Sequence, residues 1–299
     1  MSGRDWTILI VLSVIWGGSF FFIEIGLRSI APLSLVLMRV ALAAAALWLF
    51  LWARGIRADL PKEAVPAFFI LAFLNNVLPF ILFAYGQREI ASGLASILNA
   101  TTPIWGVVVA HLFTDDERMT PAKVAGVLLG FAGVAVLIGG DFLKEIGANV
   151  LAQLACLVAT LSYALSGVYG RRFKAMGVAP TSVARGQLTA STLMMLPLVL
   201  IFEQPWRAAS PTLESFAAIA ALALFCTALA YILYFQLLAS AGATNSLLVT
   251  FLIPVTAILL GWAFLGELLE PRHFAGMALI GLGLAAIDGR LLCLTAAWP

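Results

Sequence analysis

The amino-acid sequence predicts an all-α integral membrane protein with ten transmembrane helices, arranged as two inverted five-helix repeats around a central cavity. Composition and a doubled motif are the observations behind this prediction. Of the 299 residues, 63% are hydrophobic and only 11% are charged, whereas roughly a quarter of the residues of a soluble chain are charged. The chain therefore carries too little polar surface for a water-soluble fold.

The doubled motif is Glu-x3-Pro-x4-Gly-x6-Gly, which begins at Glu117 and again at Glu267. A further proline lies inside an apolar run ahead of each copy, Pro103 in the first and Pro254 in the second. Matched residues at matched intervals indicate that one unit is written twice along the chain.

The first half contains five apolar runs of the length that a bilayer requires, about 20 residues for a core of about 30 Å. The run that follows Arg4 is too long for a signal-peptide core, and no small-x-small cleavage site follows it, so we expect it to remain as the first span. Thr120 and Pro121 supply an N-cap and a first-turn proline for the fifth run. The five runs cover residues 6–26, 33–53, 64–85, 91–112 and 121–140.

The second half contains five more runs, whose beginning resembles that of the first half. Pro180 corresponds to Pro32, and Gln187 then falls opposite Arg39. Glu270 places an acidic residue at the positive end of the last helix. These runs cover residues 148–168, 181–202, 213–238, 243–264 and 272–291.

The odd number of spans in each unit sets its orientation. After five crossings the second copy must enter the membrane from the opposite side, so residues 1–144 and 145–299 are expected to form inverted repeats of one transport domain. Inverted repeats suggest a transporter, because two antiparallel halves can expose one central site to either side. About twice as many lysines and arginines lie on the side of the amino terminus as on the other side, which predicts that both termini are cytoplasmic.

Polar and aromatic side chains inside the apolar runs recur at helical spacing and therefore share faces. Polar groups within a membrane are costly unless they meet a partner or a cavity, so convergent stripes predict a binding cavity. Small polar residues also line tight helix contacts, and the intramembrane prolines can be static bends, so these alternatives stay open. The candidate substrate-binding residues are Trp16, Phe20, Asn75, Asn76, Pro79, Ser96, Asn99, Thr102, Pro103, Tyr163, Ser166, Tyr231, Tyr234, Thr250 and Pro254.

Few ionisable residues fall within the runs. Glu24 lies about 27 Å of helix beyond Trp6, so it is either a solvated helix-end glutamate or a site for a proton or a substrate amine. Arg39 is a candidate for binding a substrate carboxylate, although its long side chain can also reach the membrane surface. Glu117 is expected to cap a helix or to pair within a loop.

Signatures of cofactor chemistry are missing from the sequence. It contains no phosphate-cradling glycine loop, no zinc-type histidine pair and no nucleophile elbow, and its three cysteines match no metal pattern. No basic patch with interleaved aromatics indicates nucleic-acid binding. We therefore expect no cofactor, no metal and no enzymatic activity.

The chain resembles the EamA-type ten-span exporters of the drug/metabolite transporter superfamily. The resemblance is carried by Trp16-Gly17-Gly18-Ser19-Phe20, by the two intramembrane prolines and by the two motif copies. It implies a bacterial inner-membrane carrier with a cavity bordered largely by spans 1, 3, 4, 6, 8 and 9. The group includes a YddG-like branch that exports aromatic and some smaller amino acids. Its four-span multidrug relatives use a first-span glutamate for proton exchange, to which Ile23-Glu24-Ile25-Gly26 is faintly similar.

The leading hypothesis is export of small metabolites, amino acids first, by alternating access. Its partners would be a small-molecule substrate and the lipid bilayer, with the protein monomeric or weakly oligomeric. Efflux of lipophilic drugs is the alternative within the transport class. An intramembrane enzyme or a structural membrane subunit is the alternative from a different class.

Overall fold

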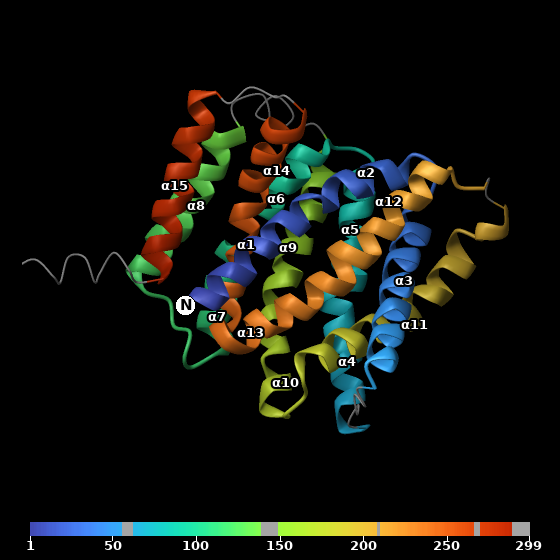
Figure 1. Cartoon of the computed structure of the whole chain (residues 1–299). Coiled ribbons are helices and arrows are strands. Elements are labelled where there is room, and N and C mark those ends of the chain that lie inside the picture. The colour runs from blue at the N-terminus through green and yellow to red at the C-terminus, as the bar shows by residue number, and fades with distance from the viewer. Residues whose placement is uncertain (56–61, 139–148, 208–209, 266–269, 289–299) are drawn as a thin grey trace, which may run out of the picture.

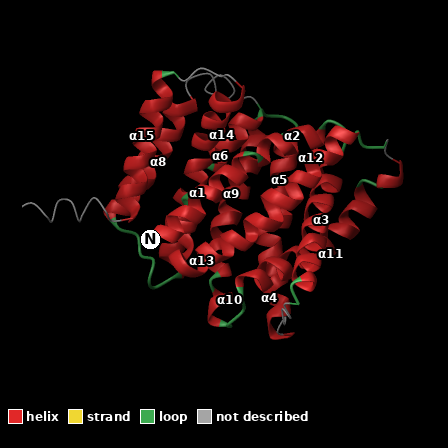
Figure 2. Ribbon diagram, viewed as in Figure 1, coloured by secondary structure: helices red, strands yellow, loops and turns green. Residues whose placement is uncertain are grey.

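The protein is helical throughout the part of the chain that the computed structural model describes, namely residues 1–55, 62–138, 149–207, 210–265 and 270–288 (Figures 1 and 2). No strand occurs in these ranges. Glu267, the tail 291–299 and the boundary between the two expected repeats lie outside them.

The first half of the chain forms eight α-helices and one π-helical turn within the described residues. The π-helical turn, Phe73–Val77, joins α4 to α5. The helices are α1 (Gly3–Gly17), α2 (Ser19–Leu27), α3 (Pro32–Ala53), α4 (Val65–Ala72), α5 (Leu78–Gly86), α6 (Ser92–Asn99), α7 (Thr102–Phe113) and α8 (Pro121–Ile138).

The second half has a similar order of elements. A π-helical turn, Leu224–Leu229, joins α12 to α13. The helices are α9 (Val150–Gly170), α10 (Arg172–Ala175), α11 (Pro180–Phe202), α12 (Leu213–Ala223), α13 (Ala230–Leu247), α14 (Val249–Leu265) and α15 (Pro271–Asp288).

All ten apolar runs predicted from the sequence fall on helices where the chain is described. Seven helical runs in this part are long and apolar enough to cross a membrane, whereas the apolar segments of α8 and α15 are shorter. The chain is therefore a multi-pass membrane protein, and ten crossings remain a prediction.

The helices are interrupted at matched places in the two halves. The π-helical turns begin at Phe73 and Leu224, 151 residues apart, which is also the interval between Pro103 and Pro254. Pro103 lacks the N–H that would bind the carbonyl of Asn99, and α6 accordingly ends at Asn99 before α7 begins. Each half thus combines a π-turn with an intramembrane proline, features that bend helices. In the second half Pro254 lies inside α14 rather than at a helix break.

The glycines of the doubled motif form a close helix contact. Helices α8 and α15 run antiparallel at one edge of the molecule (Figure 1), with Gly126 beside Gly283 and Gly133 beside the carbonyl of Gly276. A Cβ at Gly126 would lie 2.7 Å from the carbonyl oxygen of Gly283. Larger side chains at these positions would therefore separate the pair.

Candidate functional site

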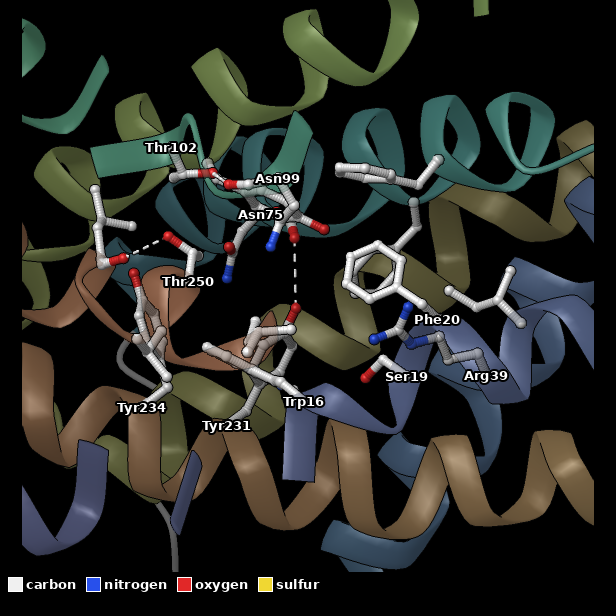
Figure 3. Close-up of a pocket in the computed structure, with 17 residues that line it drawn as sticks. Trp16, Ser19, Phe20, Arg39, Asn75, Asn99, Thr102, Tyr231, Tyr234 and Thr250 are labelled. Atoms are coloured by element: carbon white, nitrogen blue, oxygen red, sulfur yellow. Dashed lines mark hydrogen bonds between the residues drawn. The ribbon is translucent and has the colours of Figure 1, made fainter. Parts of the chain in front are cut away.

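A cavity of about 90 Å³ lies among helices from both halves of the chain (Figure 3). The structure brings most of the predicted site residues to its wall, including Arg39. Those that line it are Trp16, Phe20, Arg39, Asn75, Asn99, Thr102, Tyr163, Tyr231, Tyr234 and Thr250. The sequence-derived stripes therefore do converge.

Six predicted residues do not line this cavity: Asn76, Pro79, Ser96, Pro103, Ser166 and Pro254. Among the residues that sequence reasoning missed, Ser19 and Ile23 continue the helical stripe of Trp16 and Phe20, and that spacing could have identified them. The other missed lining residues are Phe80, Phe83, Leu247, Val249 and Ile253, which carry no polar signal.

Asn75 and Asn76 lie in the π-helical turn and form the centre of a buried polar network. Asn75 Nδ2 donates to Gln187 Oε1 at 3.0 Å, and Asn76 Nδ2 donates to Ser191 Oγ at 2.7 Å. Tyr231 Oη donates to Asn76 Oδ1, and Asn76 is fully buried. Asn76 therefore ties α11 and α13 to the turn, which is the role of a structural strut.

Ser166 and Asn75 extend the same network toward α9. Ser166 Oγ donates to Asn75 Oδ1 at 3.0 Å, so both ends of the Asn75 carboxamide bond to protein groups. Although Asn75 lines the cavity, its hydrogen-bonding capacity is largely used within the protein.

Arg39 is the cation of the cavity wall, and its side chain is only 6% exposed. Its Nε donates to Thr227 Oγ1 at 2.9 Å, and its guanidinium carbon lies 3.6 Å from the centroid of the Phe80 ring. No carboxylate among the described residues forms an ion pair with it. Arg39 therefore does not extend to the membrane surface but presents a buried positive charge without an acidic partner.

Arg39 and Gln187, which correspond in the sequence, make equivalent contacts. Arg39 bonds to Thr227 in the π-turn of the second half, and Gln187 bonds to Asn76 in that of the first. Thr227 and Asn76 are themselves 151 residues apart. The contact between Gln187 and Asn76 joins two neutral side chains that bond to each other. The contact between Arg39 and Thr227 contains the positive charge.

Aromatic rings form much of the remaining wall. The rings of Trp16 and Tyr234 lie 5.7 Å apart between centroids, and Phe83 lies 5.8 Å from Phe20 and 6.1 Å from Tyr163. Trp16 Nε1 donates to the carbonyl of Cys226 at 3.0 Å, which fixes the indole in place. The cavity can therefore enclose an apolar or aromatic group beside a cation.

Glu24, considered from the sequence, and Arg185 lie elsewhere. Glu24 is exposed on α2 and does not line the cavity. Arg185 is buried on α11, with its guanidinium carbon 4.2 Å from the centroid of Trp48, and it also lies outside the cavity wall.

A second, wider cavity of about 1250 Å³ lies beside the loop between α7 and α8 and the end of α9. We call this cavity the vestibule. Here Glu117 caps a turn of α13, because its two carboxylate oxygens accept the N–H groups of Ala243 at 2.9 Å and Thr244 at 2.8 Å. The turn starts after Gly242, whose φ of 83° interrupts α13. The capping role expected for Glu117 is confirmed.

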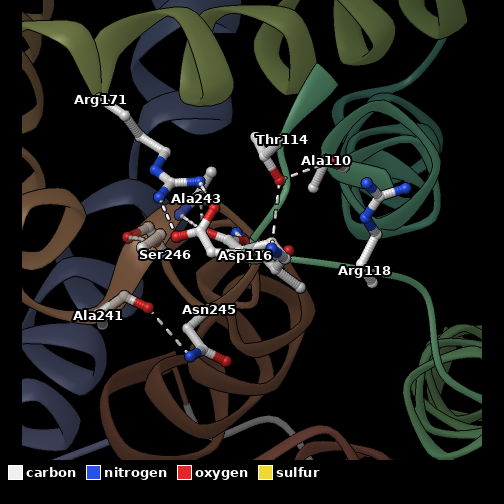
Figure 4. Close-up of polar contacts among 12 residues, drawn as sticks. Ala110, Thr114, Asp116, Arg118, Arg171, Ala241, Ala243, Asn245 and Ser246 are labelled. Atoms are coloured by element: carbon white, nitrogen blue, oxygen red, sulfur yellow. Dashed lines mark hydrogen bonds and ion pairs between the residues drawn. The ribbon is translucent and has the colours of Figure 1, made fainter. Parts of the chain in front are cut away.

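Arg171, at the end of α9, reinforces this cap (Figure 4). It forms an ion pair of 3.3 Å with Glu117 and a second pair with Asp116. The hydrogen bond from Arg171 holds the pKa of the Asp116 carboxyl below its usual range. We call Asp116, Glu117 and Arg171 the vestibule cluster.

Leu247 lies between the vestibule and the central cavity. It lines the central cavity, whereas Thr244 and Asn245 on the preceding turn line the vestibule. A Cβ on Gly106 would lie 2.7 Å from Leu247 Cδ1, and one on Gly167 would lie 3.7 Å from the same atom. Leu247 therefore fills the space between α7 and α9.

A family model described as the EamA-like transporter family matches this sequence twice, at residues 6–139 and 150–287. The chain belongs to the EamA-like transporter family. This EamA-like protein is thus a membrane transporter, in agreement with the resemblance seen in its motifs.

The sequence alignments with its relatives cover almost the whole chain. The uncharacterized transporter YoaV of Bacillus subtilis is 26% identical, with 92% of this chain and 94% of that protein covered. The uncharacterized inner membrane transporter YedA of Escherichia coli is 27% identical, with 91% and 86% covered. A probable terminal-alkyne amino-acid exporter of Streptantibioticus cattleyicolor is 25% identical, with 98% and 95% covered.

The fold also matches a crystal structure of another protein, with a TM-score of 0.76 and 18% sequence identity. The match covers 96% of this chain and 98% of the other. At this identity the similarity shows the fold alone.

Proposed function

We propose that this transporter exports small metabolites that bear a carboxylate, with amino acids, the aromatic and other neutral ones, as the leading class. The observation that carries the proposal is the buried Arg39 guanidinium, which lines an aromatic cavity without an acidic partner among the described residues. A buried unpaired cation is costly, and a substrate carboxylate would compensate it. The relative described as a probable amino-acid exporter supports this class.

Alternating access of two inverted repeats is the proposed mechanism. Its support is the double match of the family model, the equal spacing of the π-turns and prolines, and the antiparallel α8 and α15. A central site bordered by broken helices from both halves is the arrangement that such carriers use. The excess of lysine and arginine on one side supports an inner-membrane orientation with both termini cytoplasmic.

Counterflow in proteoliposomes tests the proposal. Vesicles loaded with unlabelled amino acid should take up the labelled amino acid in a saturable way, and the free acid should compete far better than its methyl ester. Arg39→Gln should lower uptake about tenfold or more, because a charge-assisted bond to the carboxylate is lost. Arg185→Gln is the matched control, since Arg185 is a buried arginine outside the cavity wall.

Two results would contradict the proposal. Absence of exchange across a broad panel of amino acids and related carboxylates would exclude the substrate class. Equal transport of lipophilic compounds without a carboxylate, unaffected by Arg39→Gln, would instead favour drug efflux.

A further inference from the structure

We infer that the end of α6 at Asn99 receives the ammonium group of the substrate whose carboxylate Arg39 binds. This inference rests on the proposed function and narrows its substrate class from carboxylates in general to α-amino acids in their zwitterionic form. Arg39 reaches the cavity from α3 and Asn99 from α6, so the two charged groups would meet different walls (Figure 3).

The Asn99 side chain faces the cavity without a hydrogen-bond partner in the part of the chain that the structure describes. It is 5% exposed and lines the cavity, and its carboxamide forms no hydrogen bond with the described residues, unlike that of Asn75. A polar group that lacks a protein partner favours a ligand that can form a hydrogen bond with it. A ligand that donates a hydrogen bond to Asn99 Oδ1 would be such a partner.

The backbone around Asn99 also favours a cation. Helix α6 ends at this residue, and the carbonyl end of a helix carries a partial negative charge. Within the described residues, the Asn99 carbonyl accepts a hydrogen bond only from the hydroxyl of Thr102, at 2.6 Å, because Pro103 has no N–H to offer. A carbonyl oxygen has two lone pairs, so this one can accept a second donor.

Helix α14 of the second half adds another acceptor. Thr250 precedes Pro254 by four residues, as Asn99 precedes Pro103, and it also lines the cavity. Its hydroxyl donates to the carbonyl of Leu247 at 2.9 Å, which leaves the oxygen lone pairs as acceptors. The described wall contains no aspartate or glutamate, so neutral oxygens, together with the aromatic faces beside them, would bind the ammonium group.

Three ligands with the same ring test the assignment: phenylalanine, 3-phenylpropionate, which lacks the amine, and phenylalanine methyl ester, which lacks the carboxylate. Each is used as a competitor in the counterflow assay. Wild-type protein should prefer phenylalanine to 3-phenylpropionate by about tenfold or more. Asn99→Leu should raise the inhibition constant of phenylalanine about tenfold and leave that of 3-phenylpropionate unchanged.

Asn99→Asp provides the complementary variant, since it places a carboxylate where the ammonium group is expected. It should strengthen competition by the methyl ester, which is a cation. Arg39→Gln should instead weaken both carboxylates together. This pattern would distinguish the ammonium-binding role of Asn99 from the carboxylate-binding role of Arg39.

The inference is overturned if Asn99→Leu weakens phenylalanine and 3-phenylpropionate equally, or if wild-type protein does not distinguish them. In either case the binding of a carboxylate by Arg39, and with it the proposed function, would still stand. Failure of the wild-type protein to bind either carboxylate would overturn both.

Discussion

At the residue scale, the Arg39 guanidinium is oriented before any ligand is bound. Thr227 Oγ1 accepts the hydrogen bond from Arg39 Nε and donates its own to the carbonyl of Leu222 at 2.8 Å, while Phe80 covers one face of the guanidinium. Thr227 is fully buried in the π-turn. The two terminal nitrogens of Arg39 are thereby left for a ligand.

Thr227 is therefore expected to act as a positioning residue. Thr227→Val keeps the volume but removes the acceptor, so the KM for a carboxylate substrate should rise about tenfold, the value of one hydrogen bond to a charged group. Thr227→Ser should behave as wild type. Competition by the methyl ester should not change in either variant, and a uniform loss for all ligands would instead indicate general damage to the fold.

Glu24 leads to a different expectation, because it is exposed and lies outside the cavity wall. Glu24→Gln should leave the response of transport to an imposed pH gradient unchanged. The measurement is uptake with and without the gradient in wild type and variant. If the variant alone loses the response, Glu24 is the proton site despite its position.

At the scale of single elements, helix ends are stabilised by carboxylates that are remote in sequence. Glu117 caps the turn after Gly242, and Glu203 accepts the N–H groups of Leu33 at 2.8 Å and Ser34 at 2.6 Å at the start of α3. An acidic group at a positive helix end is favourable. These contacts stabilise the start of α3 and the point at which α13 resumes after Gly242.

Gly242 is the residue on which the first of these caps depends. Its φ of 83° and ψ of 176° belong to a region used almost only by glycine, and a Cβ would lie 2.5 Å from Glu117 Oε1. Gly242→Ala should lower the free energy of unfolding by about 1–3 kcal/mol. Gly281→Ala is the control, since no atom lies within 4 Å of its added Cβ. The measurement is thermal unfolding in detergent, and an equal loss of stability in the two variants would contradict the prediction.

The sequence predicts the cavity wall and the helix breaks well where the signal is helical spacing or the missing N–H of a proline. The polar stripe of Asn99 and Thr102 and the missing donor of Pro103 identify both a cavity wall and a helix break. Sequence alone does not predict that Asn76 is a strut while the Asn99 side chain makes no hydrogen bond within the described residues. The partners of Asn76, such as Gln187, come from the other half of the chain. The sequence also gives no sign of the π-turns, which insert one extra residue without any change in composition.

At the scale of the whole molecule, Leu247 lies between the central cavity and the vestibule. The vestibule opens among the loop between α7 and α8, α10 and the last turns of α13. Leu247 stands on the turn that Glu117 caps and packs against glycines of α7 and α9. Movement of this one turn relative to the vestibule cluster would connect the two spaces.

The position of Leu247 predicts a measurable barrier to the entry of water-soluble reagents into the central cavity. Leu247→Ala should increase labelling of Ser19→Cys, a cavity-lining position, by a small water-soluble thiol reagent about tenfold, because the shortened side chain no longer fills the gap beside Gly106 and Gly167. Val109→Ala is the matched control, since Val109 belongs to the same apolar cluster but does not line the cavity.

Labelling of the parent protein without Ser19→Cys measures the contribution of the native cysteines, of which Cys156 and Cys226 are buried. Substrate should slow the labelling of Ser19→Cys in the Leu247→Ala protein, because both occupy the same cavity. Equal increases in the Leu247→Ala and Val109→Ala proteins would show that the whole bundle has loosened. An unchanged rate in Leu247→Ala would show that the reagent reaches the cavity by another route, and Leu247 would then not be the barrier.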